Sequence, residues 1–546
     1  MLLWVRDRAE DVVSAVRQGY AFDGACLELG ALVADGAPRA DVPVRVPLAM
    51  LNRHGLVAGA TGTGKTKTLQ VMAEQLAAAG VPVFAADIKG DLSGLASPGA
   101  PDEKIEARAD AVGQEWSPTA FPVELLRLGD DGVGVPVRAS VTSFGPTLLA
   151  KVLELNATQE SSLGLVFHYA DTAGLPLVEL SDLRAVIQHL TSAEGKQDLE
   201  GLGGLSKQTA GVILRELVNF SASGADTFFG EPEFEVASLL RVGVDGRGII
   251  TLLELPGVQD RPVLFSTFLM WLLAELFEEL PEVGDLDKPK LVFFFDEAHL
   301  LFKDASKDFL SALIQTVRLI RSKGVGVFFV TQSPKDVHED VLAQLGSRVQ
   351  HQLRAFTPND AAALKAAVRT YPTSSYDLEE LLTTLGIGEA VVTVMSEKGA
   401  PTPVAHTMLR APQSLMAPSS PEVLAGLVAA SPLAATYGER IDRESAYELL
   451  TGRIAAGPGD PLEAPEVLTK EQEIERLEAE IRGLPVPGTV PTEPQPTPSS
   501  TRKPPRKPPR KARASADSPL DAFLTTAGRE LAKEIVRGVF GTRRRR

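Results

Sequence analysis

The sequence contains a single cysteine, Cys26, among its 546 residues. One cysteine excludes an internal disulfide framework and a zinc site built from cysteine ligands, and it suits the reducing cytosol, so we expect a cytoplasmic protein. A secretory signal is also missing, because the apolar run of residues 1–5 is too short and charged residues follow it at once. These absences disfavour a secreted, disulfide-stabilised protein.

Long uninterrupted apolar runs are absent too. The most apolar stretch, residues 262–280, carries Glu275, Glu278 and Glu279 near its end. A membrane-spanning helix needs about 20 nearly uninterrupted apolar residues. We therefore predict a helix buried under a sheet, and no transmembrane segment.

The net charge of −16 hides an uneven distribution. Residues 501–546 contain 14 Lys and Arg but 4 Asp and Glu, a net charge of +10, whereas the first 500 residues hold 41 basic and 67 acidic side chains, a net charge of −26. An acidic body is no obvious binder of polyanions, and the basic tail indicates an electrostatic role for the tail itself.

Short apolar segments alternate with helical patterns from residue 54 onward, which predicts an α/β fold. Strands are expected over residues 55–59, 83–86, 248–253, 291–295 and 325–330, and helices over residues 65–79, 262–280 and 309–321. Apolar strands such as 291–295 are typical of a mainly parallel sheet covered on both faces. Only helical patterns occur over residues 142–240, which predicts an all-α insertion.

Composition divides the chain further. We expect an N-terminal segment over residues 1–50, the α/β domain over 51–410, C-terminal helices over 411–483, a linker rich in Pro, Lys and Arg over 484–515, and a basic amphipathic helix over 516–546. The linker composition cannot bury a core and predicts disorder.

Residues 59–66 follow the pattern Gly-x-x-x-x-Gly-Lys-Thr between a predicted strand and a predicted helix. Glycines let the backbone fold around an anion, and the following helix presents its positive end to it. Lys65 would reach the β- and γ-phosphates of ATP, and the Thr66 hydroxyl would join the Mg²⁺ shell. The strand and helix on either side disfavour the alternative, a fortuitous glycine-rich turn. The expected nucleotide-binding residues are Gly59, Ala60, Thr61, Gly62, Thr63, Gly64, Lys65, Thr66 and Lys67.

Two carboxylates, Asp296 and Glu297, end the predicted buried strand 291–295. Burying carboxylates is costly unless they bind something. Asp296 would hold Mg²⁺, and Glu297 would polarise the attacking water as general base. His299, which follows them, is either a coupling residue or an ordinary packed histidine.

Gln332 follows the predicted strand 325–330, at the carboxyl edge where open α/β sheets bind ligands. It is a candidate sensor of the γ-phosphate, with a turn-forming residue as the alternative. Arg318 and Arg321 lie three positions apart on one face of a predicted helix, and Arg53 precedes the glycine-loop strand. Each arginine could stabilise transition-state charge in a neighbouring subunit or could be a surface ion-pair partner.

With these motifs in place, the chain resembles the HerA/FtsK group of P-loop ATPases, and within it the bacterial HerA-like helicase family of the DUF853 type. The resemblance covers roughly residues 45–410. Besides the glycine loop and the acidic pair, it rests on residues 52–56, 87–91, 288–302, 317–327, 354–358 and 388–390.

The resemblance implies a RecA-like ATPase fold and a hexameric ring that couples ATP hydrolysis to moving a polymer, usually duplex DNA, through its centre. It also ranks the arginines, with Arg321 first, Arg53 second and Arg318 third. Archaeal HerA carries an N-terminal β-barrel before its glycine loop, and fewer than sixty residues precede Gly59 here. A partner nuclease and helicase activity are therefore not transferred with the resemblance.

Three functions remain open at this stage. The first is a ring-shaped DNA translocase, and the second is an ATP-driven motor or switch that acts on a protein partner or at a membrane surface. The third confines nucleic-acid contact to the basic run of residues 502–513, where binding would weaken steeply with salt. The final amphipathic helix could bind an anionic membrane or a partner groove, or pack on its own body.

Overall fold

The computed structural model describes residues 2–455 apart from residues 131, 200–202, 256–261, 285 and 303–306. The predicted linker over 484–515 and the predicted helix over 516–546 lie outside the described residues, as does the part of the predicted C-terminal helices beyond residue 455. Among the described residues, no helix has the length and apolar character needed to cross a membrane.

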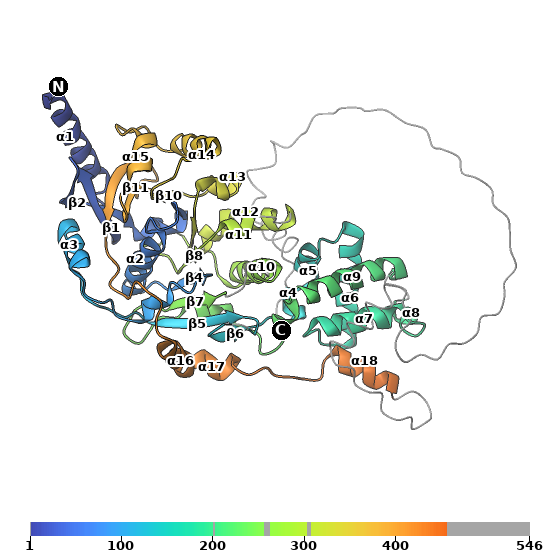
Figure 1. The fold of residues 1–546 in the computed structure, drawn as a ribbon. Helices are drawn as coiled ribbons and strands as arrows, with labels where there is room; N and C mark the ends of the chain where they lie inside the picture. Colours follow the sequence, from blue (N-terminus) through green and yellow to red (C-terminus); the bar gives the residue numbers. More distant parts are fainter. Residues whose placement is uncertain are drawn as a thin grey trace, which may run out of the picture.

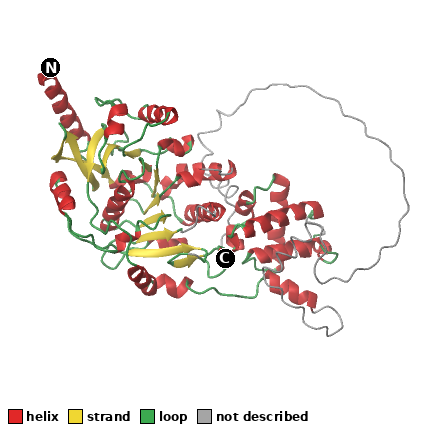
Figure 2. Ribbon diagram, in the orientation of Figure 1, coloured by secondary structure: helices red, strands yellow, loops and turns green. Residues whose placement is uncertain are grey.

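A mixed sheet of twelve strands forms the centre of the described part of the chain (Figures 1 and 2). The strands lie in the order β2-β1-β12-β11-β10-β3-β9-β8-β4-β7-β5-β6. From β10 to β6 every pair of neighbours is parallel, and β11, β12, β1 and β2 continue the sheet with antiparallel pairs. Their bounds are β1 Cys26–Ala34, β2 Ala37–Pro47, β3 Gly55–Ala58, β4 Val83–Asp87, β5 Val123–Leu128, β6 Val135–Val137, β7 Ile250–Glu254, β8 Leu291–Phe295, β9 Val325–Thr331, β10 Ser347–Gln350, β11 Glu389–Thr393 and β12 Ala405–Leu409.

Both faces of the central strands are buried, as their uninterrupted apolar sequences predict. Successive side chains of a strand point to opposite faces, so Phe293 and Phe295 of β8 join one hydrophobic core and Phe294 joins the other. The first core contains helix α10 (Pro262–Glu279), whose Phe268 ring stacks 6.5 Å from Phe84 of β4. The predicted buried helix over residues 262–280 is therefore confirmed.

A bundle of helices without strands occupies the chain between β6 and β7, on the side of the molecule away from β1 and β2 (Figure 1). It comprises α4 Val141–Phe144, α5 Pro146–Val152, α6 Ala157–Ala173, α7 Leu180–Thr191, α8 Gly195–Asp198 and α9 Lys207–Ala222, followed by the 3₁₀ helices η3 Ala225–Thr227 and η4 Val236–Leu240. Its buried leucines and phenylalanines are continuous with the α10 core. Among the described residues of the range 142–240, the regular elements are helices.

Most of the remaining helices lie over the sheet or at its edges, and the last of them, α18 (Ala446–Ala455), packs against α7 of the bundle (Figure 1). The others are α1 Leu2–Gly19, η1 Leu48–Arg53, α2 Lys65–Ala78, η2 Ser93–Ala96, α3 Glu103–Val112, α11 His299–Phe302, α12 Lys307–Ile320, η6 Arg321–Lys323, η7 Pro334–Asp336, α13 Glu339–Leu342, α14 Pro358–Val368, α15 Leu378–Thr384, α16 Pro421–Ala430 and α17 Pro432–Tyr437. Helix α18 begins after Ser445, whose backbone N–H donates to Glu448 Oε2 over 2.8 Å.

The N-terminal segment differs from its sequence-based description. Residues 1–50 carry no motif, yet β1 and β2 extend the central sheet through β12, with Gly30 opposite Leu409. Gly30 is the close-approach position in this pairing, since a Cβ there would meet the Met408 carbonyl oxygen at 2.0 Å. The first strands therefore belong to the same sheet as the glycine loop.

Candidate active site

The glycine loop, residues 59–66, connects the end of β3 to the start of α2. Gly62 has φ 82° and Gly64 has φ 111°, left-handed values that glycine adopts without steric cost. Three backbone hydrogen bonds hold the loop to its neighbours: Gly59 N donates to Thr331 O over 3.2 Å, Ala60 N to Gln352 O over 2.8 Å, and Gly388 N to Thr63 O over 3.1 Å. The loop is thus held in its conformation by β9, the end of β10 and the turn before β11.

The loop has the features of an anion site. The first backbone N–H groups of α2 have no partner inside the helix, and they lie at its positive end. Lys65 Nζ donates to Ala60 O over 3.2 Å, and burial lowers the pKa of Lys65 against the opposing charges of Glu297 and Asp296. These residues fit the phosphates of a nucleotide.

Lys67 differs from the other predicted nucleotide-binding residues. Its Nζ donates to Met416 O over 2.6 Å and to Gln70 Oε1 over 3.1 Å, so the side chain contacts its own helix and the segment after β12. In this arrangement the part of Lys67 that lies at the glycine loop is its backbone.

The acidic pair follows β8 at the same edge of the sheet as the glycine loop. Asp296 and Glu297 are each 5 % exposed. Burial and the neighbouring charge of Glu297 raise the pKa of Asp296 to about 6, although its Oδ1 accepts a 2.8 Å hydrogen bond from Glu297 N. Burial also acts to raise the pKa of Glu297, but the hydrogen bond and charge of Lys89, with the charges of His299 and Lys65, leave that pKa lowered.

Glu297 has an unusual backbone and an unsatisfied side-chain oxygen. Its φ of 46° lies in the left-handed region, which costs a non-glycine residue about 1 kcal/mol or more and recurs at functional sites. The next residue, Ala298, donates its N–H to Val330 O of β9 over 2.8 Å, and this bond fixes the turn. Glu297 Oε2 is buried without a hydrogen-bond partner among the described residues. His299 Nδ1 lies 3.2 Å from it, but not in hydrogen-bonding geometry.

Thr66 and Asp296 fit the protein's share of a magnesium site. In P-loop enzymes the ligands of Mg²⁺ are one or two carboxylates, the hydroxyl of the phosphate loop, phosphate oxygens of the substrate and water. Thr66 stands in the first turn of α2 and Asp296 at the end of β8, both beside the cradle for the phosphates. Within the described residues, no group of three or more His, Cys, Asp or Glu side chains forms a dedicated metal cage.

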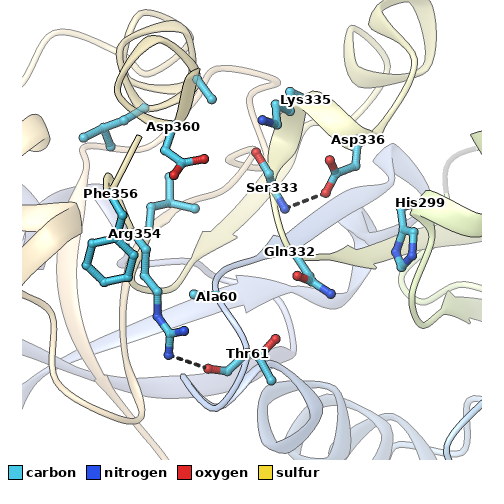
Figure 3. Close-up of a pocket in the computed structure, with 13 residues that line it drawn as sticks. Ala60, Thr61, His299, Gln332, Ser333, Lys335, Asp336, Arg354, Phe356 and Asp360 are labelled. Carbon is cyan, nitrogen blue, oxygen red and sulfur yellow. Dashed lines mark hydrogen bonds between the residues drawn. The ribbon is translucent and has the colours of Figure 1, made fainter. Parts of the chain in front are cut away.

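A cavity of about 470 Å³ opens above the glycine loop (Figure 3). Ala60 and Thr61 line its floor, and Gln332 and His299 lie on its wall, so the structure brings the predicted sensor next to the loop. Arg354, from the segment after β10, donates from Nη2 to Thr61 O over 3.3 Å. The cavity is further lined by Ser333, Lys335, Asp336, Leu353, Phe356, Asp360, Ala363 and Leu364.

The predicted arginines lie at the opposite edge of the sheet. Arg53 precedes β3 and Arg321 precedes β9, and these two strands are parallel neighbours. A strand of seven residues such as β9 spans about 20 Å, so neither arginine shares an edge with the glycine loop of its own chain. Arg318 is in the last turn of α12, near the same edge.

A buried histidine, His54, is affected electrostatically by the two first-ranked arginines, Arg321 and Arg53. His54 Nδ1 accepts from Val327 N over 3.0 Å, so the proton of the neutral ring is on Nε2, which donates to Val317 O over 2.7 Å. Burial, together with the charges of Arg321 and Arg53, lowers the pKa of His54 to about 4. The imidazole is therefore neutral near neutral pH, and both arginines act on it electrostatically.

Two residues of the candidate site carried no role in the sequence analysis. Asp87, 1 % exposed, ends β4, and burial raises its pKa to about 6. Lys89, two residues later, forms an ion pair with Glu297 Oε1. The available signal was position, because residues 87–91 follow a predicted parallel strand and carboxyl ends of such strands share an edge.

The fold and the geometry of the glycine loop with its acidic pair define a P-loop ATPase. The family model described as "Helicase HerA-like C-terminal" matches residues 33–546. The chain therefore belongs to the HerA-like family, as its motifs indicate.

Individual relatives are more distant. A probable helicase of Methanocaldococcus jannaschii, MJECL08, is 31% identical over 150 residues, which are 26% of this chain and 28% of that protein. The chain thus spans little more than a quarter of the length of that relative.

Among solved structures, the plasmid coupling protein TrwB in complex with a non-hydrolysable ATP analogue has a TM-score of 0.45 and 19% identity, over 73% of this chain and 98% of that one. Unbound TrwB has a TM-score of 0.48 and 17% identity, over 75% and 93%. VirB4 of Thermoanaerobacter pseudethanolicus has a TM-score of 0.43 and 14% identity, over 74% and 99%.

Proposed function

We propose that this chain is a ring-forming motor ATPase, with six copies in the ring, and that hydrolysis moves duplex DNA through its centre. The observation that carries the ring is the position of Arg53 and Arg321, at the edge opposite the glycine loop of their own chain. Transition-state charge in phosphoryl transfer is commonly stabilised by an arginine. A neighbouring copy that placed its amino edge on this site would supply one.

Within this proposal, each residue of the candidate site has a role. Lys65 and the amides of residues 59–66 hold the phosphates, Thr66 and Asp296 hold Mg²⁺, and Glu297 accepts the proton of the attacking water. Gln332 senses the γ-phosphate from the wall of the cavity. Arg321, and secondarily Arg53, completes the site of the next copy.

A mixing experiment tests the ring. Arg321→Ala removes the arginine that a copy donates, and Glu297→Gln disables the base of the copy's own site. Each variant alone should be nearly inactive, whereas an equal mixture should recover turnover at about a quarter of its interfaces by random assortment. The matched control replaces Glu297→Gln by the Glu297→Gln/Arg321→Ala double variant, which should restore nothing. A mixture that stays inactive contradicts donation between copies.

The DNA part of the proposal is supported by the helicase description of the family and by the helicase name of the archaeal relative. ATP turnover of the full chain should rise with added duplex DNA, and the Lys65→Ala variant should show no turnover at any DNA concentration. Turnover that is constant across the DNA titration removes DNA as the moved polymer and leaves the ATPase intact. Electron microscopy of Glu297→Gln with ATP, with and without duplex DNA, measures the subunit number and any density in the pore.

A second candidate, action on a protein partner or at a membrane surface, is favoured by the charge distribution. The first 500 residues carry a net charge of −26, and residues 501–546 carry +10. If the tail alone contacts nucleic acid, deletion of residues 501–546 abolishes DNA binding, and binding by the full chain falls steeply with salt. Retained affinity instead places the DNA site in the ring.

Co-sedimentation with anionic vesicles tests the membrane alternative. The single free cysteine supports a cytoplasmic setting for either activity.

A further inference from the structure

Lys89 forms an ion pair with Oε1 of Glu297, the candidate general base. Among the described residues, no other side chain pairs with that oxygen. Lys89 belongs to the turn after β4, and Glu297 follows β8, which pairs in parallel with β4. Lys89 Nζ contacts Glu297 Oε1, and the two side chains are 43% and 6% exposed. A partly exposed lysine therefore reaches into the site to bind a buried carboxylate.

The backbone of Lys89 is held in place by a second buried carboxylate. Asp87 Oδ1 accepts from Lys89 N over 3.2 Å and from Gly90 N over 2.8 Å, and Asp87 Oδ2 accepts from Leu92 N over 2.8 Å. Gly90 has φ 74°, a left-handed value that suits this tight turn. Since the turn is fixed, the position of the lysine stem is set before any nucleotide binds.

The contact leaves the two oxygens of Glu297 in different states. Oε1 is occupied by Lys89, and Oε2 is buried without a hydrogen-bond partner among the described residues. The backbone around the carboxylate is fixed by Ala298 N, which donates to Val330 O, and by Leu300 N, which donates to Glu297 O over 2.9 Å. The side-chain torsions remain, and the Lys89 ion pair restrains them at Oε1, while His299 Nδ1 lies 3.2 Å from Oε2 without a hydrogen bond.

We propose that Lys89 is a positioning residue that holds Glu297 by Oε1 and so presents Oε2 to the attacking water. This inference rests on the proposed role of Glu297 as general base. Lys89 takes no proton in the step: the water proton passes to Glu297 Oε2 while Lys89 stays bound to Oε1. A general base must lie within hydrogen-bond reach of the proton that it removes, and an error of about 1 Å in such an arrangement costs about 100-fold in rate.

A direct phosphate contact is the competing role for a lysine at this place, and steady-state kinetics separate the two. In the full-length Lys89→Met variant, kcat should fall by about 10- to 100-fold, while the Kd of a fluorescent ATP analogue changes by less than about twofold. Lys89→Arg, which keeps the charge and the donor, should restore most of kcat. Lys104→Met, which removes an exposed lysine of α3, is the matched control and should leave both constants unchanged.

A double-mutant comparison then tests whether Lys89 acts through Glu297. In the Glu297→Gln background, Lys89→Met should cause little further loss, because the group that it positions is already disabled. An equal fold-loss in both backgrounds overturns the proposal, and so does a rise of about tenfold or more in the Kd of the analogue with kcat retained. If Lys89→Met does not fold, Lys89→Gln serves in the same comparison.

The outcomes distinguish this inference from the proposed function. Full turnover in Glu297→Gln alone overturns the role of Glu297 as base, and with it the positioning role. Loss of turnover in Glu297→Gln without any loss in Lys89→Met overturns the positioning role alone. Turnover that is constant across a DNA titration overturns the DNA part of the proposed function and leaves the positioning role of Lys89 standing.

Discussion

The two edges of the central sheet carry different sets of residues, and the proposed function assigns both sets to one reaction. The carboxyl edge holds the glycine loop, the acidic pair, Lys89 and Gln332, and the amino edge holds Arg53, Arg321 and His54. In the proposed function the carboxyl edge binds the phosphates and accepts a proton, whereas the amino edge supplies positive charge and has no phosphate loop. The difference teaches that one copy would hold the parts of two half-sites, about the length of a strand apart.

The largest expected effect is the loss of ATP turnover when an arginine is removed from the amino edge. Arg321→Ala should reduce kcat by about 10³- to 10⁵-fold, the range for arginines that stabilise phosphoryl transfer from a neighbouring subunit. Binding of nucleotide to the variant's own glycine loop should remain, because the arginine lies at the other edge. Steady-state ATP hydrolysis and equilibrium binding of a fluorescent analogue measure the two quantities. Arg318→Ala, one helical turn earlier, is the control, and an equal loss there would mean that general positive charge is what matters at this edge.

At the carboxyl edge, Glu297→Gln should reduce kcat by about 10²- to 10⁴-fold, the usual contribution of a general base. The amide keeps the shape of the side chain but loses its capacity to accept the water proton, so nucleotide binding should persist. Single-turnover hydrolysis with excess protein measures the chemical step. Glu379→Gln in α15 removes an exposed carboxylate elsewhere and should have no effect. A variant that turns over at the wild-type rate would assign proton removal to another group.

The sequence alone predicts the centre of the fold better than its borders. Strands β8 and β9 are apolar at nearly every position because both faces are covered, and such runs are recognisable without a structure. The short strand β10 includes Ser347 and Gln350, and the edge strand β2 is mostly exposed in its first half and alternates between buried and partly exposed positions in its second. Strands of this kind depend on neighbours distant in the chain, and the local pattern does not name those neighbours.

The candidate site shows the same limit. The glycine loop is one continuous run of residues, and so is the acidic pair. The residue types and spacing within each run therefore predict its chemistry directly. The Lys89–Glu297 contact joins residues 208 positions apart and follows from the pairing of β4 with β8. The separation of Arg321 from the glycine loop likewise follows from the direction of β9. Strand order and direction are global properties, and local patterning leaves them undetermined.

The smallest expected effect is on the pH dependence of stability. It compares two buried histidines, one at each edge of the sheet. His54 lies at the amino edge, and His351, whose Nε2 is 2.8 Å from Thr68 Oγ1, lies at the carboxyl edge. Burial lowers the pKa of each to about 4, and Lys65 adds to the shift at His351 as the arginines do at His54. Between pH 6.5 and 4 the unfolded chain binds protons that the native histidines do not, so each stabilises the fold above pH 6.5 and loses that stabilisation as the pH falls.

For His54, this loss should be about 2 kcal/mol between pH 7.5 and pH 5.0. His54→Gln should therefore show a smaller drop in the free energy of unfolding over that interval than the wild-type chain, by about the same amount, in urea denaturation at the two pH values. The change in unfolding free energy between the two pH values is compared between variant and wild type, because two carboxylates affect it equally in both proteins. The pKa values of Asp87 and Asp296 are raised to about 6, so their protonation stabilises the fold as the pH falls. His351→Gln should flatten the profile similarly and also weaken nucleotide binding, because its imidazole contacts the glycine-loop helix. If His54→Gln keeps the wild-type slope, the pKa of the native imidazole is not lowered, and His54 takes up its proton over the same pH range as in the unfolded chain.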